Sequence, residues 1–256
     1  MRRGCSAASG SSTGRRGGGL KLHVVYDPGA QRPVCFAVTP ERVNDITAAQ
    51  GMAIEPGATY VFDKAYYDFA FWARLDEAGC RFVTRIKRNS PARTVAGRQA
   101  MAPILEDRLA RLSERLSGQR RNPFPSPVRL IRLRIDNGRE LTLLTNDTTA
   151  PAEEIAALYK ARWQVELFFK WIKQNLRLDR FLGSSRNAAV IQIMAALIVF
   201  LLLRLAQIAT ATTLGLQAIQ RLVAHTAFAR RPIAELFSPP KPRPPNKDPQ
   251  LILAYA

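Results

Sequence analysis

The stretch LYKARWQVELFFKWIKQN, residues 158–175, decides the fold of this chain, because it has the period of an amphipathic helix. At about 100° per residue, one arc of that helix collects its apolar side chains, together with the leucine that follows: Leu158, Val165, Phe168, Phe169, Ile172 and Leu176. The arc predicts a helix that packs against a core.

A second face of the same helix carries one acid among bases. With Tyr159 at zero, Arg162 falls at about −60° and Glu166 at about −20°. Lys173 lies at about −40°, and Lys170 borders the group at about +20°. An ordinary solvated face with a Glu166–Lys170 ion pair explains this pattern. An acid that binds a phosphate-bound metal ion explains it too, and helix geometry alone leaves both interpretations open.

The composition points to a polyanionic partner. The 256 residues contain 38 Lys and Arg against 20 Asp and Glu, which gives a net charge of +18. With 47% hydrophobic residues, the chain is expected to be globular. A globular protein of this charge is expected to bind nucleic acid, and an anionic membrane surface is the competing partner.

The cysteines and histidines support neither a disulfide framework nor a zinc site. Cys5, Cys35 and Cys80 lie far apart and show no Cys-x2-Cys spacing. His23 and His225 cannot form a metal cluster alone, and His23 is expected to be structural. This usage fits a reducing cytoplasm, which is the expected location.

The apolar run AAVIQIMAALIVFLLL, residues 188–203, is the one membrane-like segment. It is about 16 residues long, whereas a spanning helix needs about 20. We therefore expect a buried core helix and no membrane partner, with membrane insertion as the alternative.

Strand-like and helix-like segments alternate along the first part of the chain. Strands are expected at residues 20–26, 32–39, 58–63 and 80–87, and helices at 44–50 and 67–78. This order predicts the α/β class with a mixed sheet.

The pattern changes beyond residue 90. Leucines at helical spacing in a basic stretch predict a helix at residues 102–116. Residues 128–135 and 140–145 predict a hairpin around Asn137-Gly138. A shorter helix is expected at residues 216–229.

Asp63 ends the apolar segment 58–63. A carboxylate at the C-terminal edge of a strand is a common catalytic placement, but it also suits a residue that starts a turn. The segment around Asp63 leaves these two interpretations about even, and further motifs are needed to separate them.

The order of several motifs resembles one family. Tyr159, Arg162, Glu166 and Lys173 have the spacing Tyr-x2-Arg-x3-Glu-x6-Lys. This resembles the Y-R-E-K signature of bacterial insertion-sequence transposases of the DDE type, the insertion sequence 4 family. VFDKAYYDF around Asp63 is similar to the second-aspartate motif of that family. Further landmarks occur in the same order: KLH at 21–23, VND at 43–45, FVTRIKRN at 82–89 and LLTND at 143–147.

The resemblance, which runs from about residue 20 to about residue 210, implies a fold and a chemistry. The implied fold is a ribonuclease-H-like mixed sheet with flanking helices and an inserted segment, about residues 91–142, before the glutamate helix. The implied catalytic and metal-binding residues are Asp63 and Glu166, with two magnesium ions that activate the attacking oxygen and stabilise the leaving one. The implied DNA-binding residues are Tyr159, Arg162, Lys173, Lys170 and Tyr66.

Two departures from the family pattern change the expected activity. Ala65 stands where the family has glycine, which would strain a backbone with positive φ. The first aspartate is absent, because residues 1–19 contain no Asp or Glu. The chain is therefore expected to be the C-terminal part of a transposase joined to an unrelated N-terminal stretch, and to lack strand cleavage on its own.

The expected organisation has three parts. Residues 1–19 form a disordered low-complexity N-terminus, residues 20–228 a truncated catalytic domain, and residues 229–256 a Pro/Lys-rich tail. The expected partner is double-stranded DNA at transposon terminal inverted repeats, with a homodimer in a synaptic complex. A non-catalytic DNA-binding remnant, or a regulator of a full-length transposase, is the alternative function.

Overall fold

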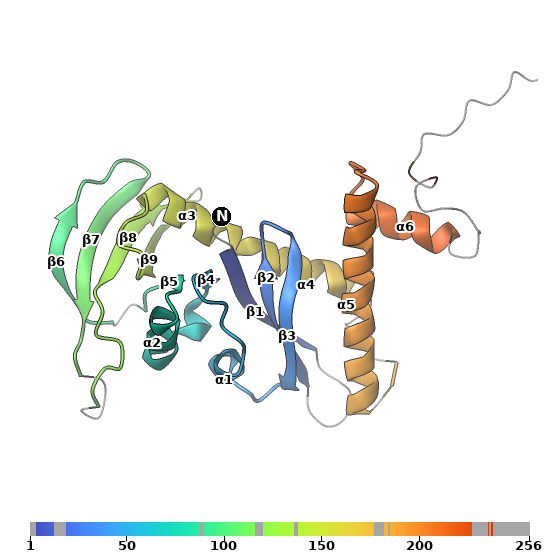
Figure 1. The fold of residues 1–256 in the computed structure, drawn as a ribbon, viewed down its shortest axis with the longest axis horizontal. Coiled ribbons are helices and arrows are strands. Elements are labelled where there is room, and N and C mark those ends of the chain that lie inside the picture. The colour runs from blue at the N-terminus through green and yellow to red at the C-terminus, as the bar shows by residue number, and fades with distance from the viewer. Residues whose placement is uncertain are drawn as a thin grey trace, which may run out of the picture. The chain divides into compact units, whose positions relative to one another are not determined.

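A nine-stranded sheet forms the centre of the fold, with the strand order β3-β2-β1-β4-β5-β9-β8-β7-β6 (Figure 1). The computed structural model describes residues 4–12, 19–87, 90–115, 120–135, 138–176, 182–183, 185–226, 235 and 237. The strands are β1 Gly4–Ser12, β2 Leu20–Asp27, β3 Arg32–Pro40, β4 Thr59–Phe62, β5 Arg81–Arg85, β6 Ala92–Arg98, β7 Ile104–Leu112, β8 Val128–Arg134 and β9 Glu140–Thr145.

Helices cover both faces of this sheet. The helices in the described part of the chain are α1 Asp45–Gln50, α2 Phe69–Glu77, α3 Ala152–Ala161, α4 Trp163–Asn175, α5 Arg186–Ala209 and α6 Leu216–Thr226, with the 3-10 helix η1 at Lys64–Tyr66. The chain divides into two compact units, Met1–Leu197 and Ile198–Ala256. The first unit holds the whole sheet.

The centre of the sheet has the predicted ribonuclease-H-like pattern. β1 runs antiparallel to β2 and parallel to β4, and β4 runs parallel to β5. β2 pairs antiparallel with β3, and β5 pairs antiparallel with β9. The α/β class with a mixed sheet is therefore confirmed.

The predicted disorder of residues 1–19 is wrong for Gly4–Ser12. These residues form β1, which is hydrogen-bonded to β2 on one side and to β4 on the other. The segment GCSAASGSS lacks large apolar side chains, so its composition resembles a linker. A central strand, however, is held mainly by backbone bonds to two neighbours, and these need no particular side chain.

Two cores lie on opposite faces of the sheet. Tyr60 and Phe62 of β4 join the core under α1 and α2, which also contains Trp72 and Leu75. Val61, between them in sequence, joins the core under α3. Figure 1 shows α1 and α2 on one side of the strands and α3 and α4 on the other. We call these sides the α2 face and the α3 face.

The inserted segment continues the sheet. β7, β8 and β9 pair antiparallel in sequence order, and β6 forms the outer edge. The helix predicted at residues 102–116 is wrong, because β7 occupies Ile104–Leu112. Its leucines have helical spacing, but pairing on both sides decides the structure of this stretch. The predicted hairpin is confirmed as β8 and β9, and Gly138 beside its turn has φ 77°.

The signature stretch 158–175 is not one uninterrupted helix. It begins within α3 and continues as α4, and Arg162 at the junction keeps right-handed helical dihedrals (φ −53°, ψ −31°). The backbone amides of Arg162 and Val165 donate to the carbonyls of Tyr159 and Arg162, three residues earlier, at 3.2 Å each. The helical path therefore tightens for one turn and then continues.

Helix α5 differs from the predicted buried core helix. It has 24 residues and is apolar enough to cross a membrane, but only 33% of its apolar window is buried. Ala189, Ile193 and Ala196 are buried, whereas Ile191 and Met194 are exposed. Only the side of α5 that carries these three buried residues packs as a core helix would. The predicted tail, residues 229–256, lies almost entirely outside the described residues.

Candidate active site

Asp63 lies where the sequence predicted, directly after the C-terminal end of β4. Its Oδ1 accepts a hydrogen bond from the backbone N–H of Ala65 at 2.8 Å and so caps η1. Its backbone carbonyl accepts a bond from Thr84 Oγ1 of β5 at 3.2 Å. Asp63 therefore both follows the end of a strand and starts a turn. The capping bond holds its carboxylate at the edge of the sheet where β4 ends.

The two residues after Lys64 correct two expectations. Ala65 is not among the described residues with positive φ, so alanine causes no left-handed strain there. Tyr66 is 3% exposed, and its ring lies 5.9 Å from that of Phe62 in the core under α2. Burial raises the pKa of Tyr66, with the charges of Asp45 and Asp63 adding to the effect. Its burial contradicts the predicted DNA contact of Tyr66.

Arg162 connects the two helices of the signature. Its Nη1 lies 2.6 Å from Glu166 Oε1, an i,i+4 pair in which the Arg162 side chain is 16% exposed and that of Glu166 37%. Its guanidinium carbon lies 5.5 Å from the centroid of the Tyr159 ring. Arg162 therefore contacts two of its three partners in the predicted wedge, Tyr159 and Glu166.

The charge of Asp63 contributes to the electrostatics of this cluster. Burial raises the pKa of Tyr159, although the charges of Arg162 and Arg85 oppose the shift. Burial lowers the pKa of Arg162, but the interactions with Tyr159, Glu166 and Asp63 outweigh it and raise the pKa overall. Arg162 thus feels the charges of both Asp63 and Glu166. Arg85, at the end of β5, was not singled out by the sequence, although it lies in the FVTRIKRN landmark.

Lys170 and Lys173 extend the cationic side of α4. Lys170 is exposed and Lys173 is partly exposed. Neither forms an ion pair with a described acid, because Glu166 pairs with Arg162 instead. The ordinary Glu166–Lys170 ion pair considered for a solvated face is thus not the one that forms.

Two sequence landmarks meet on the α2 face. Lys21 Nζ lies 3.2 Å from Asp45 Oδ1, and His23 Nδ1 lies 3.7 Å from the same oxygen. His23 Nε2 is 2.8 Å from Thr39 Oγ1, and burial lowers the His23 pKa. The cluster fastens α1 to β2 and β3, in agreement with the expected structural role of His23.

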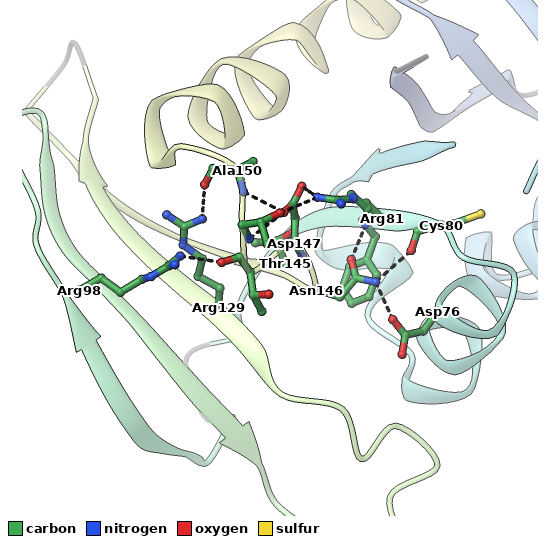
Figure 2. A network of polar contacts seen from close by, with 12 residues as sticks. Asp76, Cys80, Arg81, Arg98, Arg129, Thr145, Asn146, Asp147 and Ala150 are labelled. Atoms are coloured by element: carbon green, nitrogen blue, oxygen red, sulfur yellow. Dashed lines mark hydrogen bonds and ion pairs between the residues drawn. The ribbon is translucent and has the colours of Figure 1, made fainter. Parts of the chain in front are cut away.

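The LLTND landmark holds the start of α3 (Figure 2). Asp147 forms an ion pair with Arg81 and accepts backbone bonds from Thr149 and Ala150 at 3.0 Å each. Burial raises the pKa of Asp147, but the hydrogen bonds from Ala150, Thr149 and Arg81 outweigh it and hold the pKa well below its usual range. A charged Asp147 therefore fixes the turn that leads into α3.

Asn146 and Arg129 complete this network. Asn146 Oδ1 accepts from the amide of Phe82, while its Nδ2 donates to Asp76 Oδ1, each at 2.8 Å. Arg129 makes two bonds to Asp107, at 2.8 and 2.6 Å. It also donates to the carbonyl of Ala150, as Figure 2 shows. The helix that carries Tyr159 is thereby tied to β5, β7 and β8.

The place of a third carboxylate can be located on β1. Ser6 pairs with Val61 of β4 and with Tyr26 of β2, whose ring lies 5.4 Å from Phe168 of α4. The β1–β4 ladder ends at the pair Ala7 and Phe62, and one further step along both strands would bring Ala8 opposite Asp63. Helix α4 contacts β1 on the face of the sheet where the Tyr26 and Phe168 rings meet. Alanine offers no ligand at position 8.

The residues present do not fit a complete two-metal centre. Asp63 and Glu166 supply the hard oxygen ligands that suit magnesium. However, the described residues contain no group of three or more His, Cys, Asp or Glu that could hold a metal ion. Glu166 is also engaged by Arg162.

The model of the family described as "Transposase DDE domain" matches residues 3–202. The chain belongs to the DDE transposase family. The match begins at residue 3, so this transposase chain includes β1 in the family's own domain. The predicted unrelated N-terminal stretch is thereby corrected for this segment.

Relatives of this transposase chain are named as transposases. A protein of Sinorhizobium fredii (strain NBRC 101917 / NGR234), named as the transposase y4zB, is 39% identical over 248 residues, covering 93% of this chain and 68% of the relative. A protein of Geobacillus stearothermophilus, named as the transposase for insertion sequence element IS5377, is 31% identical over 192 residues. The alignment covers 73% of this chain and 49% of that relative.

One solved structure shares the fold. The piggyBac transposase in a synaptic complex with hairpin DNA has a TM-score of 0.57 and 9% sequence identity. The likeness covers 97% of this chain and 60% of that chain. At this identity the likeness supports the ribonuclease-H-like fold of the transposase chain alone.

Proposed function

We propose that this chain acts as a DNA transposase of an insertion sequence that binds the transposon ends but is catalytically incomplete in its present form. The observation that carries the proposal is the Arg162 cluster. One guanidinium contacts Glu166 and the Tyr159 ring and feels the charge of Asp63 at the rim of the sheet. Membership of the DDE transposase family implies a divalent metal cofactor, which gives the carboxylates beside this cluster a metal-binding role.

The cationic residues of the cluster would bind the DNA end. Arg162 is planar and forms strong bonds to phosphate. Lys170 and Lys173 add point charges on the next turns of α4. Tyr159 offers a hydroxyl and a ring to the same region. Together they would hold the phosphate backbone of the terminal inverted repeats next to the two carboxylates.

Asp63 and Glu166 would supply the carboxylate ligands for magnesium. In a complete site, two such ions would activate the attacking oxygen and stabilise the leaving one. With alanine at position 8, the chain offers two carboxylates where that chemistry needs three. We infer that DNA binding persists while strand cleavage and strand transfer do not.

A regulatory role is the second candidate. The net charge of +18 and the intact cationic helix face would let the chain occupy transposon ends without cutting them. Such a protein would act in the cytoplasm and compete with a full-length transposase, alone or as a homodimer.

The test uses the purified full chain and duplex DNA that carries the terminal inverted repeats flanking its gene. We expect binding whose affinity falls steeply with salt, as phosphate contacts require, and no nicking with magnesium. Nicking that needs magnesium and disappears in Glu166→Ala would disprove the incompleteness. Absence of salt-dependent DNA binding would disprove the proposed function itself.

A further inference from the structure

Two arginines face each other on the outer strands of the inserted segment. Arg93 of β6 and Arg111 of β7 are directly paired in the antiparallel register. Both side chains are exposed. Directly opposite residues in such a pair have Cβ atoms about 5 Å apart, so the two positive charges repel each other.

The arginine pair lies on the α3 face. Ala92 and Ala110, the sequence neighbours of Arg93 and Arg111, pack in the core under α2. Side chains alternate along a strand, so Arg93 and Arg111 point to the opposite face. Ile131 of β8 and Ile155 of α3 pack together on that face. Val61 belongs to the same core, and Asp63 follows it by two residues.

Acids pair with four other arginines of this sheet region. Asp107 binds Arg129, and Glu106 binds Arg108 and Arg132. Glu140 binds Arg132 and Arg134. Within the described part of the chain, Arg93 and Arg111 have neither an ion pair nor a side-chain hydrogen bond. Their charge is therefore available to a partner.

Protection of an edge strand does not account for the pair. A charge on β6 alone would deter association with another edge. The second arginine lies on β7, which is not an edge, and it adds repulsion within the protein. A repulsive pair on a solvent-exposed surface becomes favourable when a polyanion lies across it.

The position of the pair suits a duplex that reaches the candidate site. β7 is four strands away from β4, through β5, β9 and β8. At about 4.8 Å per strand this is roughly 19 Å across the sheet. The ladders place Leu109 level with Val61, and β7 runs antiparallel to β4, so Arg111 lies level with Thr59. Thr59 is four residues from Asp63, which adds about 13 Å along the strands and gives a separation of roughly 23 Å. The rise of a DNA strand is about 3.4 Å per nucleotide, so the separation corresponds to about seven base pairs.

We propose that Arg93 and Arg111 form a phosphate clamp that binds the DNA duplex about seven base pairs from the nucleotide held at Asp63 and Glu166. The clamp rests on the proposed function, since it presupposes a duplex at that site. Its ligand is the phosphate backbone, so it contributes affinity and orientation without reading base sequence.

The test compares two double variants of the full chain that lose the same charge. Arg93→Gln/Arg111→Gln removes the clamp, and Arg132→Gln/Arg134→Gln removes two arginines on the α2 face that are paired with Glu140. Binding to the inverted-repeat duplex is measured by fluorescence anisotropy over a salt series. We expect the clamp variant to lower the slope of log affinity against log salt by about 2 and the control to leave it unchanged.

A charge-preserving variant and a series of duplex lengths distinguish a phosphate clamp from a general effect of charge. Arg93→Lys/Arg111→Lys is expected to retain the slope of the unaltered chain. A duplex that extends about ten base pairs from the cleaved end should bind the unaltered chain more tightly than one extending about four, and the clamp variant should lose this gain. Equal slopes in the clamp variant and the unaltered chain, or equal losses in both glutamine variants, would overturn the clamp. Failure of the unaltered chain to bind DNA would instead refute the proposed function.

Discussion

Arg162 Nη1 lies 2.6 Å from Glu166 Oε1, one helical turn away on the same face. The contact keeps the only acid of α4 beside a cation whose charge also interacts with Asp63. A metal ion at Glu166 would therefore have to share or displace a guanidinium. The same guanidinium is the group best suited to bind a phosphate at this point.

Replacing Arg162 by glutamine is expected to weaken DNA binding without unfolding the chain. Glu166 is 37% exposed, and an ion pair at such a surface contributes about 1 kcal/mol or less. Loss of one phosphate contact should lower the slope of log affinity against log salt by about 0.9. Anisotropy titrations with the inverted-repeat duplex measure this slope. The exposed Arg42, placed before α1, provides the control Arg42→Gln, and an equal change there would contradict a specific role for Arg162.

Placing an acid at position 8 is expected to restore metal binding. In Ala8→Asp the new carboxylate would stand opposite Asp63 in the extended β1–β4 ladder. Three carboxylates should bind magnesium in the folded state, so the melting temperature should rise with magnesium concentration. Ala8→Asn offers a side chain of the same shape without the charge and should show no such rise.

The same variant tests catalysis. Ala8→Asp is expected to nick the inverted-repeat duplex with magnesium, whereas Ala8→Asp/Glu166→Ala should not. If Ala8→Asp binds magnesium and DNA yet never nicks, then a missing first carboxylate is not what prevents cleavage.

The buried pair of Arg129 and Asp107 is expected to dominate the stability of the inserted strands. Their side chains are 3% and 5% exposed. Arg129→Met should destabilise the chain by about 3–5 kcal/mol, because it leaves a buried carboxylate unpaired. Arg129→Met/Asp107→Leu removes both charges and should recover much of that loss. Urea unfolding measures both values, and a double variant less stable than Arg129→Met would contradict this account.

Asp147 is expected to make stability depend on pH. Its pKa is lowered in the folded chain, so its stabilising contribution is present above the unfolded value of about 3.9. The contribution is lost as the pH falls from there toward the folded pKa. Asp147→Asn should therefore unfold at lower urea than the unaltered chain at pH 7. The difference should shrink below about pH 4, and a constant difference across this range would exclude the ionised carboxylate as its cause.

The sequence predicted the helix wedge and the strands β2, β3, β4 and β5 because these depend on local period, whereas it missed β1. Tyr159, Arg162 and Glu166 meet as helical angles require. Asp63 ends its strand because an apolar run stops there. The chemical role of these residues came from the ordered motifs, since an ion pair on a helix has no function of its own.

Long-range pairing explains what the sequence could not reveal. β7 has the leucine spacing of a helix, and only its ladders with β6 and β8 show that it is a strand. Tyr66 was predicted to meet DNA from its motif position, whereas the turn after Asp63 directs it into the aromatic core. The pairing of Arg93 with Arg111 depends on a register across two strands that no local pattern specifies.

Strand β1 shows that the fold of this domain can be kept without an acidic side chain on that strand. Its segment GCSAASGSS retains no acid, yet it keeps the central slot of the sheet through main-chain bonds to β2 and β4. Main-chain hydrogen bonds tolerate side-chain substitutions as long as proline, which cannot donate to the ladder, is not introduced. A gene of this kind could drift until its product no longer cuts DNA and still yield a folded protein. Natural selection on folding alone would not detect the loss.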